Sequence, residues 1–241
     1  MLRSLPFAAL FLSLSTAAFA ATGLVEPTLK MTPRHDGRVR VAMTLDACMG
    51  KTDHRILDTL VQEKIPATIF VTARWLKHNS EALAVMMAHP DLFEIENHGE
   101  NHVPAVDKPV AIYGIAAAGS EAAVEQEVEG GRQAIVAMTG LQPQWFRGAT
   151  AKYTTSSMAT INRLGMRVAG YSVNGDGGSL LGAAATAKHI ASARDGDVII
   201  SHINQPTHEA GEGVVRGLLA LKARGVVFTM LDDPSFTPPG N

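Results

Sequence analysis

Two histidines separated by three residues are the first candidates for chemistry in this sequence. His98 and His102 lie in the segment Asn97–His102, which reads NHGENH. On one helical turn or in a tight loop, this spacing lets two imidazoles bind the same ion. Two unrelated loop histidines are the alternative, since short motifs also occur by chance. With carboxylates available nearby, the pair favours one divalent metal, and zinc is the first choice for imidazole ligands.

Polar residues also stand where several apolar, strand-like runs end. They include Asp46, Arg147, Asp176 and His202. In a barrel of parallel strands, the reacting groups come from the carboxyl ends of different strands. Reactive residue types that recur at the ends of separate runs therefore indicate an enzyme.

The elements that must position these residues follow a regular alternation. Strand-like runs cover 39–45, 67–72, 92–97, 145–147, 167–173, 198–202 and 226–231. Helical patterns cover 53–64, 121–138, 155–164, 183–193 and 212–224. This alternation predicts an α/β fold with a parallel sheet. Seven strands favour a closed or nearly closed (β/α) barrel, with an open doubly wound sheet as the alternative.

The first twenty residues have the pattern of a secretory signal peptide. Arg3 supplies the positive charge, residues 7–14 form a short apolar run, and Ala18–Ala20 has the small-x-small pattern of a cleavage site. We therefore expect residues 1–20 to be removed and residues 21–241 to form one periplasmic or secreted domain. The apolar run is short for a membrane span, so no membrane anchoring is expected after cleavage, and an uncleaved anchor is the alternative.

Composition excludes other classes of protein. The 241 residues include 21 basic and 23 acidic side chains, a formal net charge of −2. No block of like charges is present, so we expect no nucleic-acid partner. The single cysteine, Cys48, excludes an internal disulfide framework.

The ordered motifs resemble the polysaccharide deacetylases of carbohydrate esterase family 4, which contain a NodB-type domain. The family's T-F-D-D is similar to Thr44–Ala47, its N-H-[ST]-x-x-H to Asn97–His102, and its F-R-P-P to Phe146–Ala149. Its strand-five aspartate motif is similar to Asn174–Asp176 and its L-x-H to Ile200–His202. The resemblance covers most of the mature chain. It implies a distorted (β/α) barrel of about seven parallel strands and a metal-dependent removal of acetyl groups from a glycan.

The resemblance also implies a role for each matching residue. Asp46 would be the general base that activates water, and Arg147 would orient it. The two histidines of the NHGENH segment would hold the metal. His202 would be the general acid that protonates the leaving group, and Asp176 would belong to the same charge relay.

The chain departs from the family at one metal ligand. The second aspartate of the first motif is Ala47 here, so a third protein ligand must come from elsewhere. Asp53, seven residues beyond Asp46, is one candidate, and it is equally a helix N-cap. Asp46 itself and the thiolate of Cys48 are the others. Cys48 is more simply interpreted as a small buried apolar side chain.

Further departures concern the substrate. Gly148 replaces a proline, and Gly178 stands where the family has a tryptophan, so fewer aromatic faces are available to stack on a sugar. Trp145 and Tyr153 could partly compensate, although Trp145 is equally expected in the core.

A polar, glycine-rich segment follows His202 and is expected to be a loop. Asn204 and His208 are candidate substrate contacts there. Gly211 and Gly213 would allow close approach of a ligand. A loop folded on itself by local hydrogen bonds is the alternative.

These observations predict an exported metal-dependent hydrolase that removes N-acetyl or O-acetyl groups from a polysaccharide or oligosaccharide. A non-catalytic carbohydrate-binding relative is the alternative that Ala47 suggests. A C–N hydrolase for a non-sugar amide is the alternative that the missing aromatic residues suggest. The retained reactive residues favour the enzyme.

Overall fold

The computed structural model describes residues 23–32, 36–234 and 236 of the chain. The expected signal peptide, residues 1–20, lies outside the described residues. Among the described helices, none is long and apolar enough to cross a membrane.

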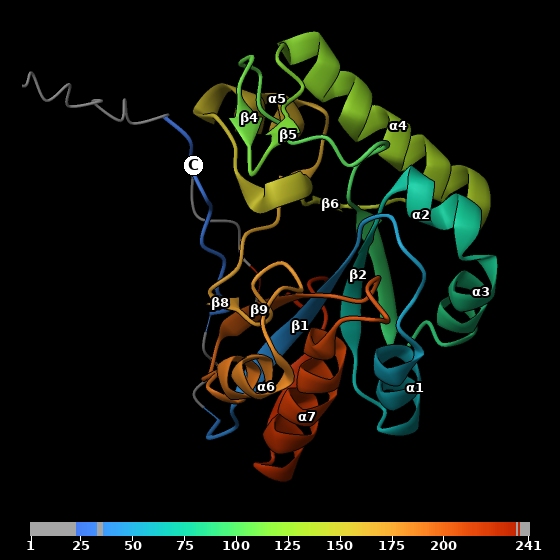
Figure 1. Cartoon of the computed structure of the whole chain (residues 1–241), viewed down its shortest axis with the longest axis vertical. Helices are drawn as coiled ribbons and strands as arrows, with labels where there is room; N and C mark the ends of the chain where they lie inside the picture. Colours follow the sequence, from blue (N-terminus) through green and yellow to red (C-terminus); the bar gives the residue numbers. More distant parts are fainter. Residues whose placement is uncertain (1–22, 33–35, 235, 237–241) are drawn as a thin grey trace, which may run out of the picture.

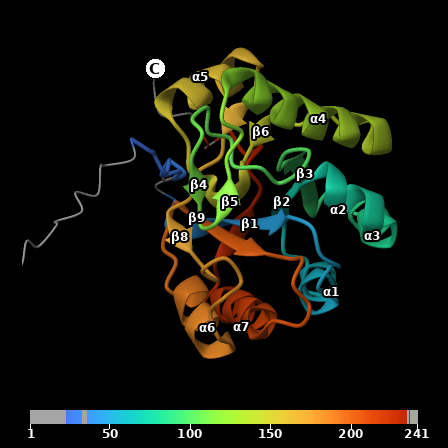
Figure 2. The same cartoon turned by 45° about the horizontal axis from the view of Figure 1, so that its top comes forward.

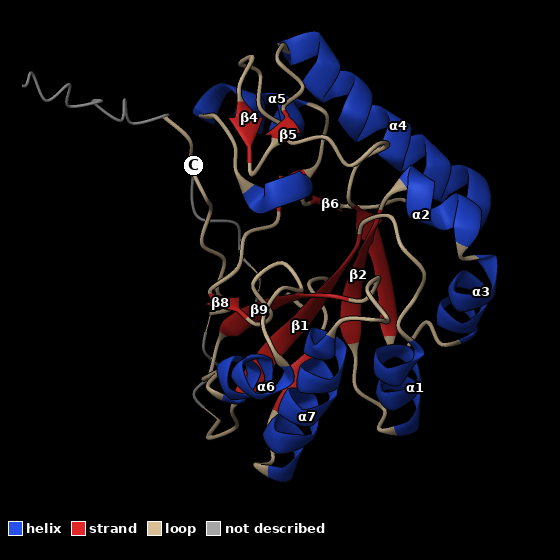
Figure 3. Ribbon diagram, in the orientation of Figure 1, coloured by secondary structure: helices blue, strands red, loops and turns tan. Residues whose placement is uncertain are grey.

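A curled sheet of eight parallel strands forms the centre of the described structure (Figures 1 and 3). The strands are β1 (Arg40–Ala47), β2 (Ala67–Val71), β3 (Phe93–Asn97), β6 (Trp145–Phe146), β7 (Arg167–Val168), β8 (Val173–Asn174), β9 (Asp197–His202) and β10 (Val227–Thr229). Their order is β7-β6-β3-β2-β1-β9-β8, and β10 pairs with the first half of β1. Every pairing in this sheet is parallel, as the alternation of elements predicted.

The first and last strands of this order, β7 and β8, belong to one continuous stretch of chain. β7 pairs with β6, and β8, only five residues further along, pairs with β9. The sheet therefore curls into a distorted (β/α) barrel, which confirms the predicted fold class. The run predicted as a single strand, 167–173, is interrupted because an N-terminal segment crosses it. The amide of Leu29 donates to the carbonyl of Tyr171, and a Cβ on Gly170 would lie 2.1 Å from the carbonyl oxygen of Pro27.

Seven α-helices cover the outside of the described barrel. They are α1 (His54–Gln62), α2 (Ala73–His78), α3 (Ser80–Ala88), α4 (Glu121–Thr139), α5 (Thr155–Arg163), α6 (Ala183–Ala191) and α7 (Glu209–Ala223). Helices α6, α7 and α1 lie side by side on one flank, and α2 and α4 pack together on another (Figures 1 and 2). The sequence pattern did not predict α2 and α3, because α2 is one and a half turns long and α3 is apolar without a clear face.

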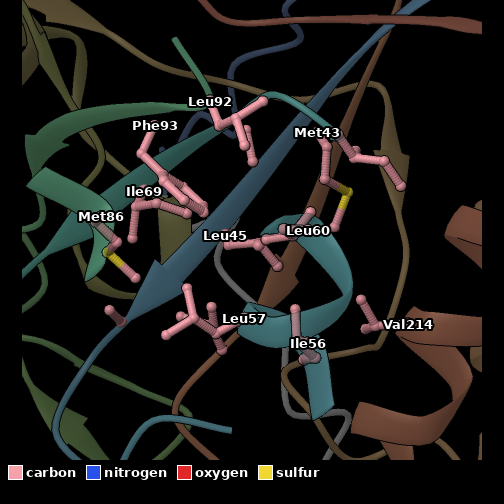
Figure 4. Close-up of a cluster of buried hydrophobic side chains, with 14 of the residues drawn as sticks. Met43, Leu45, Ile56, Leu57, Leu60, Ile69, Met86, Leu92, Phe93 and Val214 are labelled. Atoms are coloured by element: carbon pink, nitrogen blue, oxygen red, sulfur yellow. The ribbon is translucent and has the colours of Figure 1, made fainter. Parts of the chain in front are cut away.

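Strand alternation separates the core from the site. Met43 and Leu45 of β1 point outward and pack against Ile56, Leu57 and Leu60 of α1 (Figure 4). The intervening residues of β1 point into the barrel. There an inner cluster fills the barrel: Leu29, Met31, Ala42, Phe70, Trp145, Ala169, Val198, Leu231 and Phe236. Asp46 continues the inward-facing series at the carboxyl end of β1, which places its carboxylate above the apolar filling.

Helix α7 begins three residues earlier than predicted. Gly211 and Gly213 lie within this helix and are buried, so the prediction of a ligand-binding loop at these glycines is wrong. A Cβ on Gly211 would lie 2.0 Å from the carboxylate of Asp53, and one on Gly213 would lie 2.5 Å from the carbonyl oxygen of Ala183. The glycines permit close packing of α7 against the start of α1 and against α6.

Candidate active site

Asp46, His98, His102 and His202 line one cavity of about 490 Å³, and Arg147 and Asp176 are buried beside it. Asp46 is on β1, His98 and His102 follow β3, and His202 ends β9. Because all these strands run in the same direction, their carboxyl ends meet at one face of the barrel. The structure thus brings together four side chains that come from three separate strand ends.

Arg147 fixes the position of Asp46. The guanidinium is fully buried, and its Nη1 lies 2.9 Å from Asp46 Oδ1 and 2.8 Å from the hydroxyl of Thr44. Its other nitrogens donate to the carbonyl oxygens of Ala169 and Gly170. Burial acts to raise the pKa of Asp46, but Arg147, His98 and His202 together outweigh burial and hold that pKa below its usual value. Asp46 is therefore a carboxylate with one oxygen bound to Arg147.

Asp176 orients His202. The Nδ1 atom of His202 lies 3.1 Å from both carboxylate oxygens of Asp176, and its backbone amide donates to Oδ2 at 2.6 Å. Burial acts to lower the pKa of His202, but Asp176 raises it well above the usual value. Asp176 therefore serves His202 and is not in contact with the Asp46–Arg147 pair, unlike the single relay that the resemblance implied. His202 also interacts with the thiol of Cys48, which raises its pKa further. Because Asp176 holds Nδ1, Nε2 is the ring nitrogen that can face Cys48 and the cavity.

Cys48, His98 and His102 form a group of possible metal ligands. One donor atom from each lies within 4.8 Å of the others, and the Sγ of Cys48 is 3.4 Å from Nε2 of His98. The Nδ1 of His98 donates to the carbonyl of Arg147, which turns Nε2 toward the thiol. Burial acts to raise the pKa of Cys48, but the neighbouring His98, His102 and His202 together lower it well below its usual value. A thiolate with two imidazoles is a donor set that suits zinc, so these residues fit a divalent metal.

Asp53 does not belong to this group. It is the N-cap of α1, and it accepts from the backbone amide of Arg55 at 3.0 Å and from its guanidinium at 2.9 and 2.6 Å. The structure therefore contradicts the prediction of Asp53 as the third ligand and shows the helix cap that was its alternative. Asp46 remains close, with Oδ2 3.9 Å from Nε2 of His98. Cys48 is the third donor that the geometry provides.

The loop that contains His102 is held by a buried carboxylate. Glu127 of α4 accepts from the backbone amides of Asn101 and Val103, on either side of His102, at 3.0 Å. His102 itself has a φ of +62°, in the left-handed region that non-glycine residues rarely adopt. Glu127 therefore helps to impose the backbone conformation that directs His102 toward the other two donors.

The four predicted substrate contacts do not line the cavity. Trp145, Tyr153 and Asn204 are at most 1% exposed, which leaves them no surface to offer a substrate. Trp145 fills the barrel, and the hydroxyl of Tyr153 accepts from the amide of Gly148. The three buried residues are thus corrected from substrate contacts to structural residues. His208 is the N-cap residue of α7 but makes no side-chain capping hydrogen bond, and its Nδ1 donates to the carbonyl of Ser179.

Asn174, Gly178 and Ile200, which belong to the motifs of the family resemblance or directly follow them, also line the cavity. The sequence analysis missed the remaining lining residues, which are Glu26, Tyr113, Ile115, Thr150, Ala151, Tyr171, Gly177 and Leu180. Tyr113 lies on a short hairpin of β4 (Ala111–Ile112) and β5 (Ile115–Ala116). Strands of two residues leave no periodic pattern, so the only local signal was the glycine that follows Tyr113.

The sequence profile described as "Polysaccharide deacetylase" matches residues 34–169, more than half of the chain. The chain belongs to the polysaccharide deacetylase family. The match covers β1 through β7 and so includes Asp46, both histidines of the NHGENH segment and Arg147. No curated protein sequence matches this chain.

Solved structures of the same family share the fold. A family 4 carbohydrate esterase from Streptomyces lividans, in complex with acetate, has a TM-score of 0.64 and 18% identity over 80% of this chain and 93% of its own. The peptidoglycan deacetylase PdaC from Bacillus subtilis has a TM-score of 0.65 and 17% identity over 81% and 89%. A family 4 pseudoenzyme from Bacillus anthracis has a TM-score of 0.64 and 18% identity over 85% and 70%. At these identities the likeness shows a common fold, which active and inactive members share.

Proposed function

We propose that this protein is an exported, metal-dependent deacetylase that hydrolyses acetyl groups of a polysaccharide or oligosaccharide. The observation on which this rests is the joint placement of three groups at one cavity, which Asp46, His98, His102 and His202 line. An Arg147-bound carboxylate, Asp46, and an Asp176-bound imidazole, His202, accompany the Cys48–His98–His102 donor set. Family membership and the solved deacetylases of similar fold support the reaction class.

Cys48, His98 and His102 would hold the divalent metal, with zinc the ion that their sulfur and nitrogen donors favour. When bound, such an ion supplies Lewis-acid polarisation of the acetyl carbonyl and lowers the pKa of water. Asp46 then has the role of proton acceptor. Arg147 occupies Oδ1 of that carboxylate, so Oδ2, on the side of His98, is the atom that takes the proton from the attacking water.

His202 is the proton donor for the leaving group. Asp176 holds its Nδ1, which fixes the ring and favours the protonated imidazole. Nε2 is then the atom that delivers a proton to the departing amine or alkoxide oxygen. A bound carboxylate and a protonated imidazole in the same cavity are the base and acid that hydrolysis of an amide needs.

A non-catalytic carbohydrate-binding role is the second candidate. Ala47 removes one ligand of the family pattern, and one solved protein of similar fold is described as a pseudoenzyme. The position of Cys48 favours the enzyme, because its sulfur provides a third donor beside both histidines and so replaces the ligand that is lost at Ala47.

Acetate release from acetylated glycans tests the proposal. Purified protein without residues 1–20, reconstituted with zinc, is incubated with N-acetylated chitin oligosaccharides, peptidoglycan and O-acetylated xylan. We expect release from at least one glycan, with Asp46→Asn as the inactive control that retains zinc. Sugar binding without acetate release, at one zinc per chain, would favour the non-catalytic role.

Export rests on the N-terminal pattern alone. Expression of the full chain in a bacterial host, followed by N-terminal sequencing of the protein recovered outside the cytoplasm, tests it. We expect a mature chain that begins at Ala21. Recovery of the protein with Met1 intact in the cytoplasm would refute export.

A further inference from the structure

A strained tyrosine stands at the edge of the candidate active site. Strands β4 and β5 form a hairpin whose two-residue turn is Tyr113–Gly114, with φ of +52° and +80°. Positive φ at both turn positions is the type I′ arrangement, in which asparagine and glycine are preferred at the first position. A bulky aromatic residue is sterically disfavoured there. Backbone strain of this kind concentrates at functional sites, so a role for the Tyr113 side chain in ligand binding would account for the strain.

Packing of the Tyr113 ring within the fold does not account for the strain. It is 77% exposed, so it buries little surface in the fold. Its contact is with Lys152, whose ammonium lies 4.9 Å from the ring centroid. Lys152 is in turn 3.8 Å from Glu26. The ammonium occupies one face of the ring, and the large exposed area leaves the rest of the ring for a ligand.

Two more exposed apolar side chains line the same cavity. Leu180, on the loop between β8 and α6, is 81% exposed, and Ile115, at the start of β5, is 37% exposed. The same cavity is lined by Asp46, His202 and other polar residues. Apolar side chains with a few polar groups around them are typical of a site for an organic ligand. Here the apolar residues come from two separate loops, and they accompany the reactive groups.

We propose that Tyr113, with Leu180, forms a platform that binds the apolar C–H face of a pyranose ring of the substrate. A sugar ring has an apolar face and polar edges, so it can cover Tyr113 while its hydroxyl groups reach polar lining residues such as Asn174. The inference rests on the proposed function and deepens it, because it selects glycans built of pyranose rings over small non-sugar amides. It also supplies an aromatic face in a chain where Gly178 replaces the family's tryptophan.

The test compares Tyr113→Asn, Tyr113→Ala and Tyr113→Phe in the zinc-reconstituted protein. Titration calorimetry measures the binding of an N-acetylglucosamine tetramer to proteins that also have His202→Ala, so that turnover is slow during the titration. We expect the asparagine and alanine variants to bind about tenfold more weakly and the phenylalanine variant to bind within about twofold of the parent. Leu219→Ala, at an exposed position on the outer helix α7, is the control and should leave binding unchanged.

A second measurement separates binding from a structural effect. Asparagine suits the first position of a type I′ turn, so Tyr113→Asn should raise the melting temperature or leave it unchanged while it weakens sugar binding. In the parent with His202 present, KM for the tetramer should rise about tenfold in this variant, and hydrolysis of an aryl acetate should stay within about twofold.

Equal tetramer affinity in the parent and Tyr113→Asn, or no tetramer binding by the parent, overturns the platform. A different result is weaker tetramer binding by Tyr113→Asn together with no acetate release by the parent protein. This result supports the platform and overturns the proposed deacetylase. The two proposals therefore fail separately.

Discussion

At the scale of single residues, the third donor of the candidate metal site comes from the position next to the expected one. Ala47 ends β1 with its side chain in the outer hydrophobic cluster, whereas Cys48 follows the strand and contacts His98. The sequence could name Cys48 and Asp53 as candidates, because both lie shortly after Asp46. It could not choose between them, because the choice depends on where each side chain points once the strand has ended.

Replacement of Cys48 should therefore affect metal binding far more than replacement of Asp53. Cys48→Ser removes a thiolate donor and should lower zinc affinity by at least about 100-fold, given the strength of thiolate coordination. Asp53→Asn keeps a good N-cap and should retain one zinc per chain. Titration of metal-free protein against a chromogenic zinc chelator measures both affinities. Full affinity in Cys48→Ser together with a loss in Asp53→Asn would restore Asp53 as the ligand.

His202→Ala should slow deacetylation of a glycan by roughly 10²–10⁴-fold, the usual range for a positioned proton donor. An aryl acetate has a leaving group that needs no proton, so its hydrolysis should slow much less. Steady-state rates on the two substrates, with zinc content measured in parallel, provide the comparison. An equal loss on both substrates would assign His202 another role, such as oxyanion binding, and a loss of zinc would make it a ligand.

At the scale of elements, strong local patterns predicted the structure where burial was regular. Helix α4 ends at Thr139 and is followed by Gly140 with a φ of +72°, as the Thr139–Gly140 stop predicted. The start of α7 was placed too late, because Gly211 and Gly213 are typical of a loop when read locally. Their actual reason is distant in sequence, namely contact with Asp53 and with α6. The β4–β5 hairpin was missed because its strands are too short to show alternation.

Gly213→Ala should destabilise the protein, although alanine is the better helix former. In an open helix this change stabilises by up to about 1 kcal/mol. Here the new Cβ would lie 2.5 Å from both the carbonyl oxygen of Ala183 and the Cβ of Thr186. Overpacking of this kind costs about 1–3 kcal/mol, which urea unfolding can measure. Glu212→Ala, at the exposed neighbouring position, should change stability by less than about 0.5 kcal/mol. Stabilisation by Gly213→Ala would show that α6 and α7 are packed less closely.

At the scale of the whole molecule, the sequence pattern predicted the parallel barrel but not the residues that fill its interior. Alternating strands and helices predict parallel pairing independently of which side chains lie inside the barrel. The interior holds two acidic residues of β3 on the inward-facing side. Glu94 accepts from the hydroxyl of Thr68 and the amide of Leu231, and Glu96 accepts from the amide of Trp145 at 2.7 Å. Nothing in the local sequence shows that these glutamates face the barrel, because their partners lie in other segments of the chain.

These glutamates predict a fall in stability at alkaline pH. Burial, reinforced by Glu94, raises the pKa of Glu96 to about 9, whereas the unfolded chain loses this proton near 4.5. The folded state binds the extra proton between these values, so stability falls as pH rises from about 4.5 toward 9. Glu96→Gln mimics the protonated side chain and should stabilise the protein at pH 8–9 by on the order of 2 kcal/mol, with a smaller gain near pH 5.

Thermal unfolding across this pH range measures the effect. Glu81→Gln, at an exposed position on α3, is the control and should leave the pH profile unchanged. A Glu96→Gln profile parallel to that of the wild type would show that Glu96 is ionised in the folded protein.

Zinc titration of the metal-free protein, with acetate release from an N-acetylated chitin oligosaccharide as the signal, tests the central claim most directly. If Cys48, His98 and His102 hold the ion beside Asp46 and His202, acetate release should rise in proportion to bound zinc and reach a plateau at one equivalent per chain. In the His98→Ala/His102→Ala double variant, the signal should stay at background throughout the titration. Acetate release that does not depend on zinc, or that persists at the wild-type rate in the double variant, would contradict the account.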